Sequence, residues 1–264
     1  MKDHTWGTVA IVASGPIRRL RLTRPAERNA ISGQMIDELR LALAALADDS
    51  DARVVVLEGE GKSFCAGADI EEMKASGGKT FDANLRDAER LAELFHALDT
   101  FPRPVIGRVH GHCLGGGVGL VACCDIAIAS SDARFAFTEV RLGLAPAVIS
   151  PYVIAAIGAR QARKLFATGE SFDAQRAFAI GLVHGVVAPD ALDAGVEAVV
   201  VQLLQGGPAA QGEIKKLVAM VAREGGADDL EARTTDVIAR LRASPEGKEG
   251  LDAFLGKREP GWRR

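Results

Sequence analysis

The 264-residue sequence has little net charge, few aromatic residues and no long apolar run, and each shortage excludes a class of protein. The formal net charge is −3 and aromatic residues make up 5%, so there is no basic aromatic surface for a nucleic acid and no polybasic membrane anchor. No stretch approaches about eighteen consecutive apolar residues, and Met1–His4 carries no hydrophobic signal segment. We therefore expect no nucleic-acid or membrane partner and a cytoplasmic location.

Cysteine is also scarce. The sequence has four cysteines, and no pair at metal-ligand spacing is accompanied by a second pair. This usage fits a reducing compartment better than a disulfide framework. We therefore predict neither a disulfide nor a metal site at these positions, which are Cys65, Cys113, Cys123 and Cys124.

Glycine, in contrast, is abundant: the 29 glycines make up about 11% of the chain, against a usual share of about 7%. Many lie in two segments. Gly61–Ile70 follows the apolar run Val54–Leu57, and His110–Leu120 lies between another apolar strand and an apolar helix. Small residues let a ligand approach the backbone closely, and unpaired N–H groups at a helix start attract negative charge. The two segments therefore predict that backbone amides contact a ligand.

The order of strand and helix patterns predicts an α/β fold with a largely parallel sheet. Short apolar or alternating runs alternate with amphipathic patterns, and Ser32 has the features of a helix N-cap. After about residue 190 the periodicity is only helical. The expected strands are Val9–Ala13, Ile17–Thr23, Val54–Leu57, Val105–Val109 and Ile126–Ala129, and the later helices are about Asn84–Thr100, Leu192–Leu204, Pro208–Arg223, Leu230–Arg242 and a short one from Pro245.

One glycine pattern suggests a different ligand. Gly117–Ala122 matches the G-x-G-x-x-A pattern of dinucleotide-binding folds, and Glu139 lies twenty residues beyond the second glycine. In that fold the pattern begins where a strand ends, whereas here it begins eight residues after Val109. The context therefore argues against a nicotinamide cofactor.

Seven segments along the chain form a recognisable series. They are Leu22–Ala30, Ser63–Met73, Gly111–Ala129, Phe135–Gly143, Ile157–Ala162, Ala179–Val183 and Ala253–Arg258. In order and spacing they resemble the signatures of the enoyl-CoA hydratase/isomerase (crotonase) family, over essentially the whole chain. The resemblance implies a crotonase (ClpP/crotonase-like) spiral of ββα units as the core domain over residues 1–195. It also implies a helical region over 196–264 for oligomerisation and active-site cover, as a homotrimer or a dimer of trimers.

The resemblance further implies an acyl-CoA substrate and no cofactor other than the coenzyme A that this substrate carries. Two backbone N–H groups, at Ala66 and Gly116, would form an oxyanion hole for the thioester carbonyl, where negative charge develops during proton transfer. From its place before a helix, Asp69 also predicts an N-cap. The implied coenzyme A contacts are Arg28, Ala30, Ala66, Ala68, Asp69 and Ile70, with Phe254 and Lys257 at the adenosine part, here or in a neighbouring subunit.

The acid/base residues depart from the family pattern. Typical hydratases of the family carry two glutamates, and the resemblance places the second at Glu139 and the first at Gly119. Because glycine transfers no proton, a mechanism with two glutamates is excluded. One carboxylate can still shuttle a proton between two carbons, or activate a water and return its proton. Without the resemblance, Glu139 would be interpreted as a surface residue paired with Arg141.

Three functions stay open. The preferred one is a hydratase that adds water to an enoyl-CoA, because Phe135–Val153 resembles methylglutaconyl-CoA and isohexenylglutaconyl-CoA hydratases. A substrate such as 3-methylglutaconyl-CoA, or a related branched one, carries a second carboxylate. Candidates to contact that carboxylate are Arg141, Ser150 and Tyr152, although an ordinary structural role would explain each of them. The alternatives are a Δ3,Δ2-enoyl-CoA isomerase with one glutamate and a non-catalytic acyl-CoA-binding protein.

Overall fold

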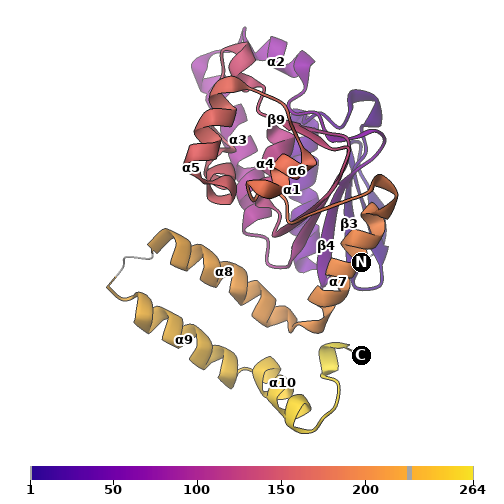
Figure 1. Cartoon of the computed structure of the whole chain (residues 1–264), viewed down its shortest axis with the longest axis vertical. Coiled ribbons are helices and arrows are strands. Elements are labelled where there is room, and N and C mark those ends of the chain that lie inside the picture. Colours follow the sequence, from indigo (N-terminus) through magenta and orange to yellow (C-terminus); the bar gives the residue numbers. More distant parts are fainter. Residues whose placement is uncertain (1, 225–227, 264) are drawn as a thin grey trace.

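The structure is a computed structural model and describes residues 2–224 and 228–263. Figure 1 shows twisted β-sheet and surrounding helices in one part of the chain, and a helical arm formed by the C-terminal residues. The larger sheet has the strand order β1-β2-β3-β4-β6-β8-β11, and the smaller sheet has the order β10-β9-β7-β5. The larger sheet consists of β1 (His4–Thr5), β2 (Val9–Ser14), β3 (Ile17–Leu22), β4 (Val54–Gly59), β6 (Val105–Val109), β8 (Ile126–Ser130) and β11 (Gly185–Val187).

The strand directions confirm the predicted α/β class. Strands β3, β4, β6, β8 and β11 pair in parallel, while β1, β2 and β3 form an antiparallel edge. All five predicted strands are present. The smaller sheet was not predicted, and its strands have only two or three residues each. They are β5 (Ser63–Cys65), β7 (His112–Leu114), β9 (Arg134–Ala136) and β10 (Phe172–Asp173).

The predicted helices are also present, and their starts follow ordinary capping chemistry. The hydroxyl of Ser32 accepts a hydrogen bond from the Met35 amide at 3.2 Å, as its N-cap position predicted. The helices are α1 (Gly33–Asp48), α2 (Ile70–Ser76), α3 (Phe81–Asp99), α4 (Gly116–Cys123), α5 (Ser150–Thr168), α6 (Ala174–Ala179), α7 (Leu192–Gln205), α8 (Pro208–Glu224), α9 (Leu230–Ala243) and α10 (Pro245–Leu255). The short 3-10 helices are η1 (Pro25–Glu27), η2 (Glu139–Leu142), η3 (Pro189–Ala191) and η4 (Gly261–Arg263).

The larger sheet is buried on both faces because its central strands are apolar at successive positions. In β4, Val55 and Leu57 belong to the main core with residues of α1 and α3. Val54 and Val56 face the other way and pack with Val196 and neighbouring residues of α7. Full burial of one such side chain stabilises the fold by about 1.5–3 kcal/mol. The sheet therefore provides a rigid support for the loops that leave its strands.

The C-terminal helices α8, α9 and α10 extend from this core as an arm (Figure 1). Arg53 attaches the arm by donating to the carbonyl oxygens of Trp262 (2.9 Å) and Gly206 (2.7 Å). Lys215 in α8 forms an ion pair with Asp125 at 2.9 Å. The predicted boundary at residue 195 falls inside α7, whose contacts place it with the sheet. Among the described residues, no helix is both long and apolar enough to cross a bilayer.

Candidate active site

The two glycine-rich segments lie side by side because β5 and β7 pair in parallel. The backbones approach so closely that side chains would not fit. A Cβ built on Gly67, whose φ is +95°, would lie 3.1 Å from the Leu114 carbonyl oxygen and 3.9 Å from the Gly115 Cα. A Cβ on Gly117 would lie 2.6 Å from the Cys65 carbonyl oxygen. Glycine is therefore required here by close packing, and Gly117 lies within α4 rather than in the strand-to-helix turn of a dinucleotide site.

The amide predicted as the first oxyanion donor is used inside the fold, which corrects that prediction. The N–H of Ala66 donates to the carbonyl oxygen of Arg28 at 3.0 Å. Ile31 then pairs with Ala68, donating to the Gly67 carbonyl and accepting from the Asp69 amide. This pairing leaves the N–H of Ala68 without a hydrogen-bond acceptor among the described residues. Because Ala68 is exposed whereas Gly67 is buried, a ligand can reach the free amide of Ala68.

The second predicted donor, Gly116, lies where a helix begins, and its role as an oxyanion donor stays a prediction. Gly116 is the first residue of α4, and helix starts leave amides without intrahelical acceptors. Its N–H has no acceptor among the described residues, and Gly116 is half-buried. Gly67 and Gly115 lie next to each other in space. The residues that follow them, Ala68 and Gly116, therefore bring two free amides and the positive end of a helix close together. This arrangement suits an oxygen atom that develops negative charge.

Glu139 lies beside these loops. A Cβ on Gly115 would be 2.9 Å from the Glu139 Oε1 atom, so only glycine lets the carboxylate approach this closely. The other oxygen, Oε2, is buried and has no hydrogen-bond partner among the described residues. Burial raises the pKa of the Glu139 carboxyl above its ordinary value. The carbonyl of Glu139 accepts from the Leu144 amide at 3.0 Å, which fixes the turn that carries it.

The position of the missing glutamate is filled by apolar side chains. Gly119 is buried, and a Cβ built on it would lie 2.3 Å from the Ile149 Cγ2 atom and 2.9 Å from the Phe95 Cε1 atom. Sequence reasoning missed both contacts, since nothing in a sequence pattern links α3, α4 and the start of α5 at these residues. Position 119 thus carries no acidic group and is surrounded by apolar side chains.

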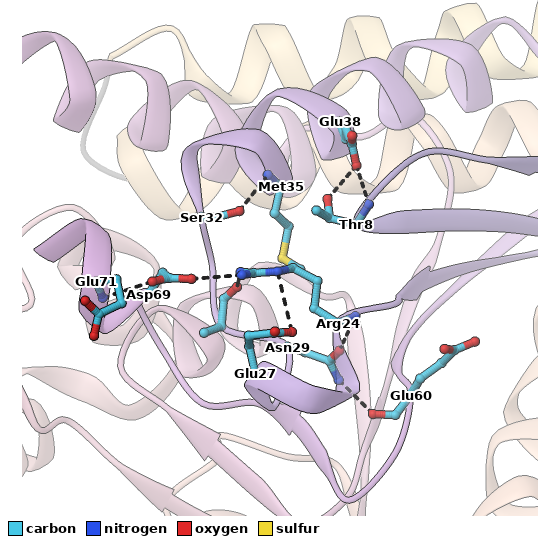
Figure 2. A network of polar contacts seen from close by, with 11 residues as sticks. Thr8, Arg24, Glu27, Asn29, Ser32, Met35, Glu38, Glu60, Asp69 and Glu71 are labelled. Atoms are coloured by element: carbon cyan, nitrogen blue, oxygen red, sulfur yellow. Dashed lines mark hydrogen bonds and ion pairs between the residues drawn. The ribbon is translucent and has the colours of Figure 1, made fainter.

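A partly buried polar network joins the turn at residues 24–31 to the loop at residues 63–69 (Figure 2). The side chain of Asn29 accepts from the Arg24 amide (2.9 Å) and donates to the carbonyls of Glu60 (2.9 Å) and Ser63 (2.8 Å). The Arg24 guanidinium donates to Asp69 at 3.0 Å. Asn29 has a φ of +56°, a conformation that asparagine tolerates better than most residues. Sequence reasoning did not single out Asn29. The available signal was its position two residues after a short helix, where asparagine tolerates a positive φ.

Comparison with known proteins agrees with this geometry. The model of the enoyl-CoA hydratase/isomerase family matches residues 13–264. The chain belongs to this family. The crotonyl-CoA hydratase of Syntrophomonas wolfei is 33% identical over 248 residues, which are 91% of this chain and 92% of the relative. The 2,3-dehydroadipyl-CoA hydratase of Escherichia coli is also 33% identical, over 92% of this chain and 94% of the relative.

A solved structure extends the agreement to three dimensions. The enoyl-CoA hydratase from Shewanella pealeana matches with a TM-score of 0.93 at 39% identity, over 97% of this chain and 96% of that chain. The predicted crotonase fold is therefore confirmed. The protein is an enzyme of the enoyl-CoA hydratase/isomerase family, and its substrate is an acyl-CoA.

For this family member, most of the predicted coenzyme A contacts lie together. The Arg28 carbonyl holds the Ala66 amide, and Asp69 caps α2 by accepting from the Glu71 (3.0 Å) and Glu72 (3.4 Å) amides. The Asp69 N-cap prediction is confirmed, and the Arg24 ion pair and these amides lower the pKa of its carboxyl despite partial burial. The pairing of residues 28–31 with residues 66–69 brings into one neighbourhood Arg28, Ala30, Ala66, Ala68, Asp69 and Ile70.

Two predicted coenzyme A contacts lie elsewhere in the chain. Phe254 belongs to α10 and is 81% exposed, and Lys257 follows that helix with a φ of +50°. Figure 1 places α10 at the end of the molecule opposite to α2. Within one chain these residues therefore do not join the site, and their contact with coenzyme A stays a prediction for a neighbouring subunit.

The three residues predicted to contact the acyl group all make contacts within the fold. Arg141 is exposed and donates to the Gly169 carbonyl at 2.7 Å, rather than pairing with Glu139. Ser150 begins α5, and its hydroxyl donates to the Ala147 carbonyl at 2.8 Å. The ring of Tyr152 lies 6.1 Å from the ring of Phe95, centre to centre. Substrate contact by these residues stays a prediction.

The cysteines take no part in the chemistry that this geometry supports. All four are buried and free of disulfides. Burial raises the pKa of Cys65 to about 12 and also raises the pKa of Cys113, so these thiols stay protonated at neutral pH. Glu139, whose carboxyl has a raised pKa, stays the predicted group for proton transfer.

Proposed function

We propose that the enzyme adds water across the double bond of an enoyl-CoA. The observation that carries this proposal is the Glu139 carboxyl. Its buried Oε2 atom has no hydrogen-bond partner among the described residues, and its Oε1 atom lies against Gly115, directly before the free amide of Gly116. The Ala68 and Gly116 amides are proposed to bind the thioester carbonyl. Removing one such donor in other enzymes lowers kcat by roughly 100- to 1,000-fold.

In this mechanism one carboxylate performs both proton transfers. The Glu139 carboxylate takes a proton from water while the water oxygen bonds to the β-carbon of the substrate. The electrons of the carbon–carbon double bond move toward the carbonyl oxygen and form a thioester enolate, which the two amides stabilise. The protonated Glu139 then returns the proton to the α-carbon, and the carbonyl and the carboxylate form again. A raised pKa suits a group that must both accept and donate a proton near neutral pH.

The test is to incubate the pure enzyme with a series of enoyl-CoA thioesters and follow product mass and double-bond position. We expect a product heavier by one water, lost in Glu139→Gln, with coenzyme A ester binding retained. For the active enzyme, kcat/KM should rise with pH through the raised pKa of Glu139, since the ionised form activates water. Failure of every thioester to react, with binding intact, would reject the hydratase and leave the acyl-CoA-binding role.

Isomerisation is the second candidate, because one specific observation favours it. The apolar wall formed by Phe95 and Ile149 beside Gly119 provides no second polar group to hold a water molecule. Glu139 alone can move a proton from the α-carbon to the γ-carbon through the same enolate. Products of unchanged mass with a displaced double bond would identify this Δ3,Δ2-enoyl-CoA isomerase.

For the acyl group we propose a branched enoyl thioester with a second carboxylate, such as 3-methylglutaconyl-CoA. The Arg141 guanidinium is exposed and lies two residues after Glu139, so it is the cation nearest in sequence that is available to such a carboxylate. Arg141→Ala should lower kcat/KM for the carboxylated substrate by roughly tenfold or more, given that a hydrogen bond to a charged group contributes about 1.5–3 kcal/mol. The matched measurement uses crotonyl-CoA, which lacks the carboxylate and should be little affected. Equal effects on both substrates would remove Arg141 from recognition.

A further inference from the structure

Gly116 and Gly119 lie on the same face of α4, since residues three apart on a helix are neighbours. The ring of Phe95 spans both positions. Its Cζ atom lies 4.0 Å from a Cβ built on Gly116, and its Cε1 atom lies 2.9 Å from a Cβ built on Gly119. A side chain at position 119 would therefore project from the same helix face as one at position 116, toward Phe95 and Ile149.

Side chains fill the volume beside position 119, and small rotations would not move them away. The Ile149 Cγ2 and Cβ atoms would lie 2.3 Å and 2.9 Å from a Cβ at position 119. Cβ is the branch point of isoleucine, so rotation about χ1 does not remove it. Ile149 is 3% exposed and Phe95 is completely buried, so neither side chain can turn into solvent. The carbonyl of Ile149 also accepts from the Val153 amide at 3.1 Å, which fixes its backbone at the start of α5.

We propose that Ile149, supported by Phe95, limits this site to one carboxylate by filling the volume in which a second acidic side chain would lie. The inference rests on the proposed function, because it takes Glu139 as the proton-transfer group. Ile149 thus acts by exclusion: it keeps the surroundings of position 119 apolar. Replacing Gly119 by glutamate would then not be enough to add a second acid/base group. Ile149 would have to be replaced by a smaller residue at the same time.

The first test is a thermal double-mutant cycle with Gly119→Glu and Ile149→Gly. Glycine is accepted at position 149 because this residue is the N-cap of α5. We expect Gly119→Glu to lower the Tm of the wild-type chain by on the order of 5–10 °C through overpacking. In the Ile149→Gly chain, the same change should lower Tm by less than half as much. The control is Val148→Gly, which removes a neighbouring β-branched side chain. Val148 provides none of the atoms nearest to position 119, so this change should not reduce the effect of Gly119→Glu on Tm.

The second test measures whether a carboxylate placed there takes part in the reaction. With the enoyl-CoA that the wild-type enzyme turns over, the variant with both Gly119→Glu and Ile149→Gly should exceed Ile149→Gly alone in kcat/KM by on the order of 100-fold. The dependence of its kcat/KM on pH should show two ionisations, whereas that of the wild type should show one. A merely structural role for Ile149 would change Tm without adding the second ionisation.

Several results would overturn the proposal. One is a Gly119→Glu enzyme with the wild-type Tm and a second ionisation, since Ile149 would then exclude nothing. Another is a folded double variant that binds a coenzyme A ester but keeps the single ionisation. Should the glutamate variants not fold, Gly119→Ala with and without Ile149→Gly repeats the thermal cycle with one methyl group, and additive Tm changes would reject the contact. The thermal cycle needs no turnover, so it separates failure of this inference from failure of the hydratase proposal.

Discussion

The Glu139 side chain is half-buried beside the amides that we propose as the oxyanion hole, and burial of its carboxyl lowers stability when the group is ionised. Burial raises its pKa, so the folded state binds the proton more tightly than the unfolded state does. The stability that protonation contributes is complete below the ordinary glutamate pKa of about 4.3 and is lost as pH rises through the raised value. Glu139→Gln should therefore have a higher Tm than the wild type at pH 7–8 but not near pH 4, while losing activity.

Thermal melts from pH 4 to pH 8 measure this difference directly. The exposed Glu89 provides the control, since Glu89→Gln removes a carboxyl at the surface of α3 and should show the same Tm difference at every pH. A Tm difference for Glu139→Gln that does not grow with pH would show that the carboxyl is not destabilised by burial.

Asn29 is a second residue whose importance comes from its surroundings. It is completely buried, makes three hydrogen bonds through its side chain and has a positive φ. Figure 2 shows its hydrogen bonds with Arg24 and Glu60. Asn29→Ala should destabilise the fold by about 2–4 kcal/mol, because backbone carbonyls lose their donors and alanine resists a left-handed conformation. It should also lower kcat/KM, because this network holds the Ala68 loop. Asn29→Gly relieves only the backbone strain, so a loss as large as that of Asn29→Ala would assign the effect to the hydrogen bonds.

Among the elements, β5 and the start of α4 leave no room between them for added volume. A Cβ on Gly117 would lie 2.6 Å from the Cys65 carbonyl oxygen and 2.9 Å from the Cys65 Cβ atom. Gly117→Ala should therefore cost about 1–3 kcal/mol and separate the two amide-bearing loops, so kcat/KM should fall more than stability alone explains. The control is Gly33→Ala in the first turn of α1, where the nearest atom lies 3.6 Å away and no loss is expected. Denaturant titration with parallel kinetics provides the comparison.

The elements that could be predicted from the sequence are those long enough to repeat a pattern. The apolar run in β4 and the periodic apolar face of α1 are visible without the structure, as is the Ser32 cap. The strands β5, β7 and β9 have three residues each, too few to show a period, although they bring the two glycine segments together. The choice between Ala66 and Ala68 depends on pairing with residues 28–31, a long-range contact that no local pattern encodes. The same is true of the Ile149 contact with Gly119.

At the scale of the whole molecule, the core and the arm differ in how they are covered. The core buries its apolar residues on both faces of the larger sheet. The arm exposes apolar side chains on α8, α9 and α10, whereas isolated helices need such faces to be packed. These side chains are Ile214 (53% exposed), Val218 (61%), Ile238 (47%), Leu251 (55%), Phe254 (81%) and Leu255 (77%). The described part of one chain therefore leaves the arm without a complete apolar contact.

A homotrimer or a dimer of trimers, with the arm between subunits, would cover these side chains and bring Phe254 and Lys257 to a neighbouring site. Light scattering after size exclusion should give three or six times the mass of one chain, and Tm should rise with protein concentration. Val218→Asp should weaken assembly and lower Tm, because it places a charge within the contact. Leu41→Asp makes the same change at a 58% exposed position of α1, outside the arm, and should leave the mass unchanged. A monomeric wild type with full activity would show that the arm serves neither assembly nor the site.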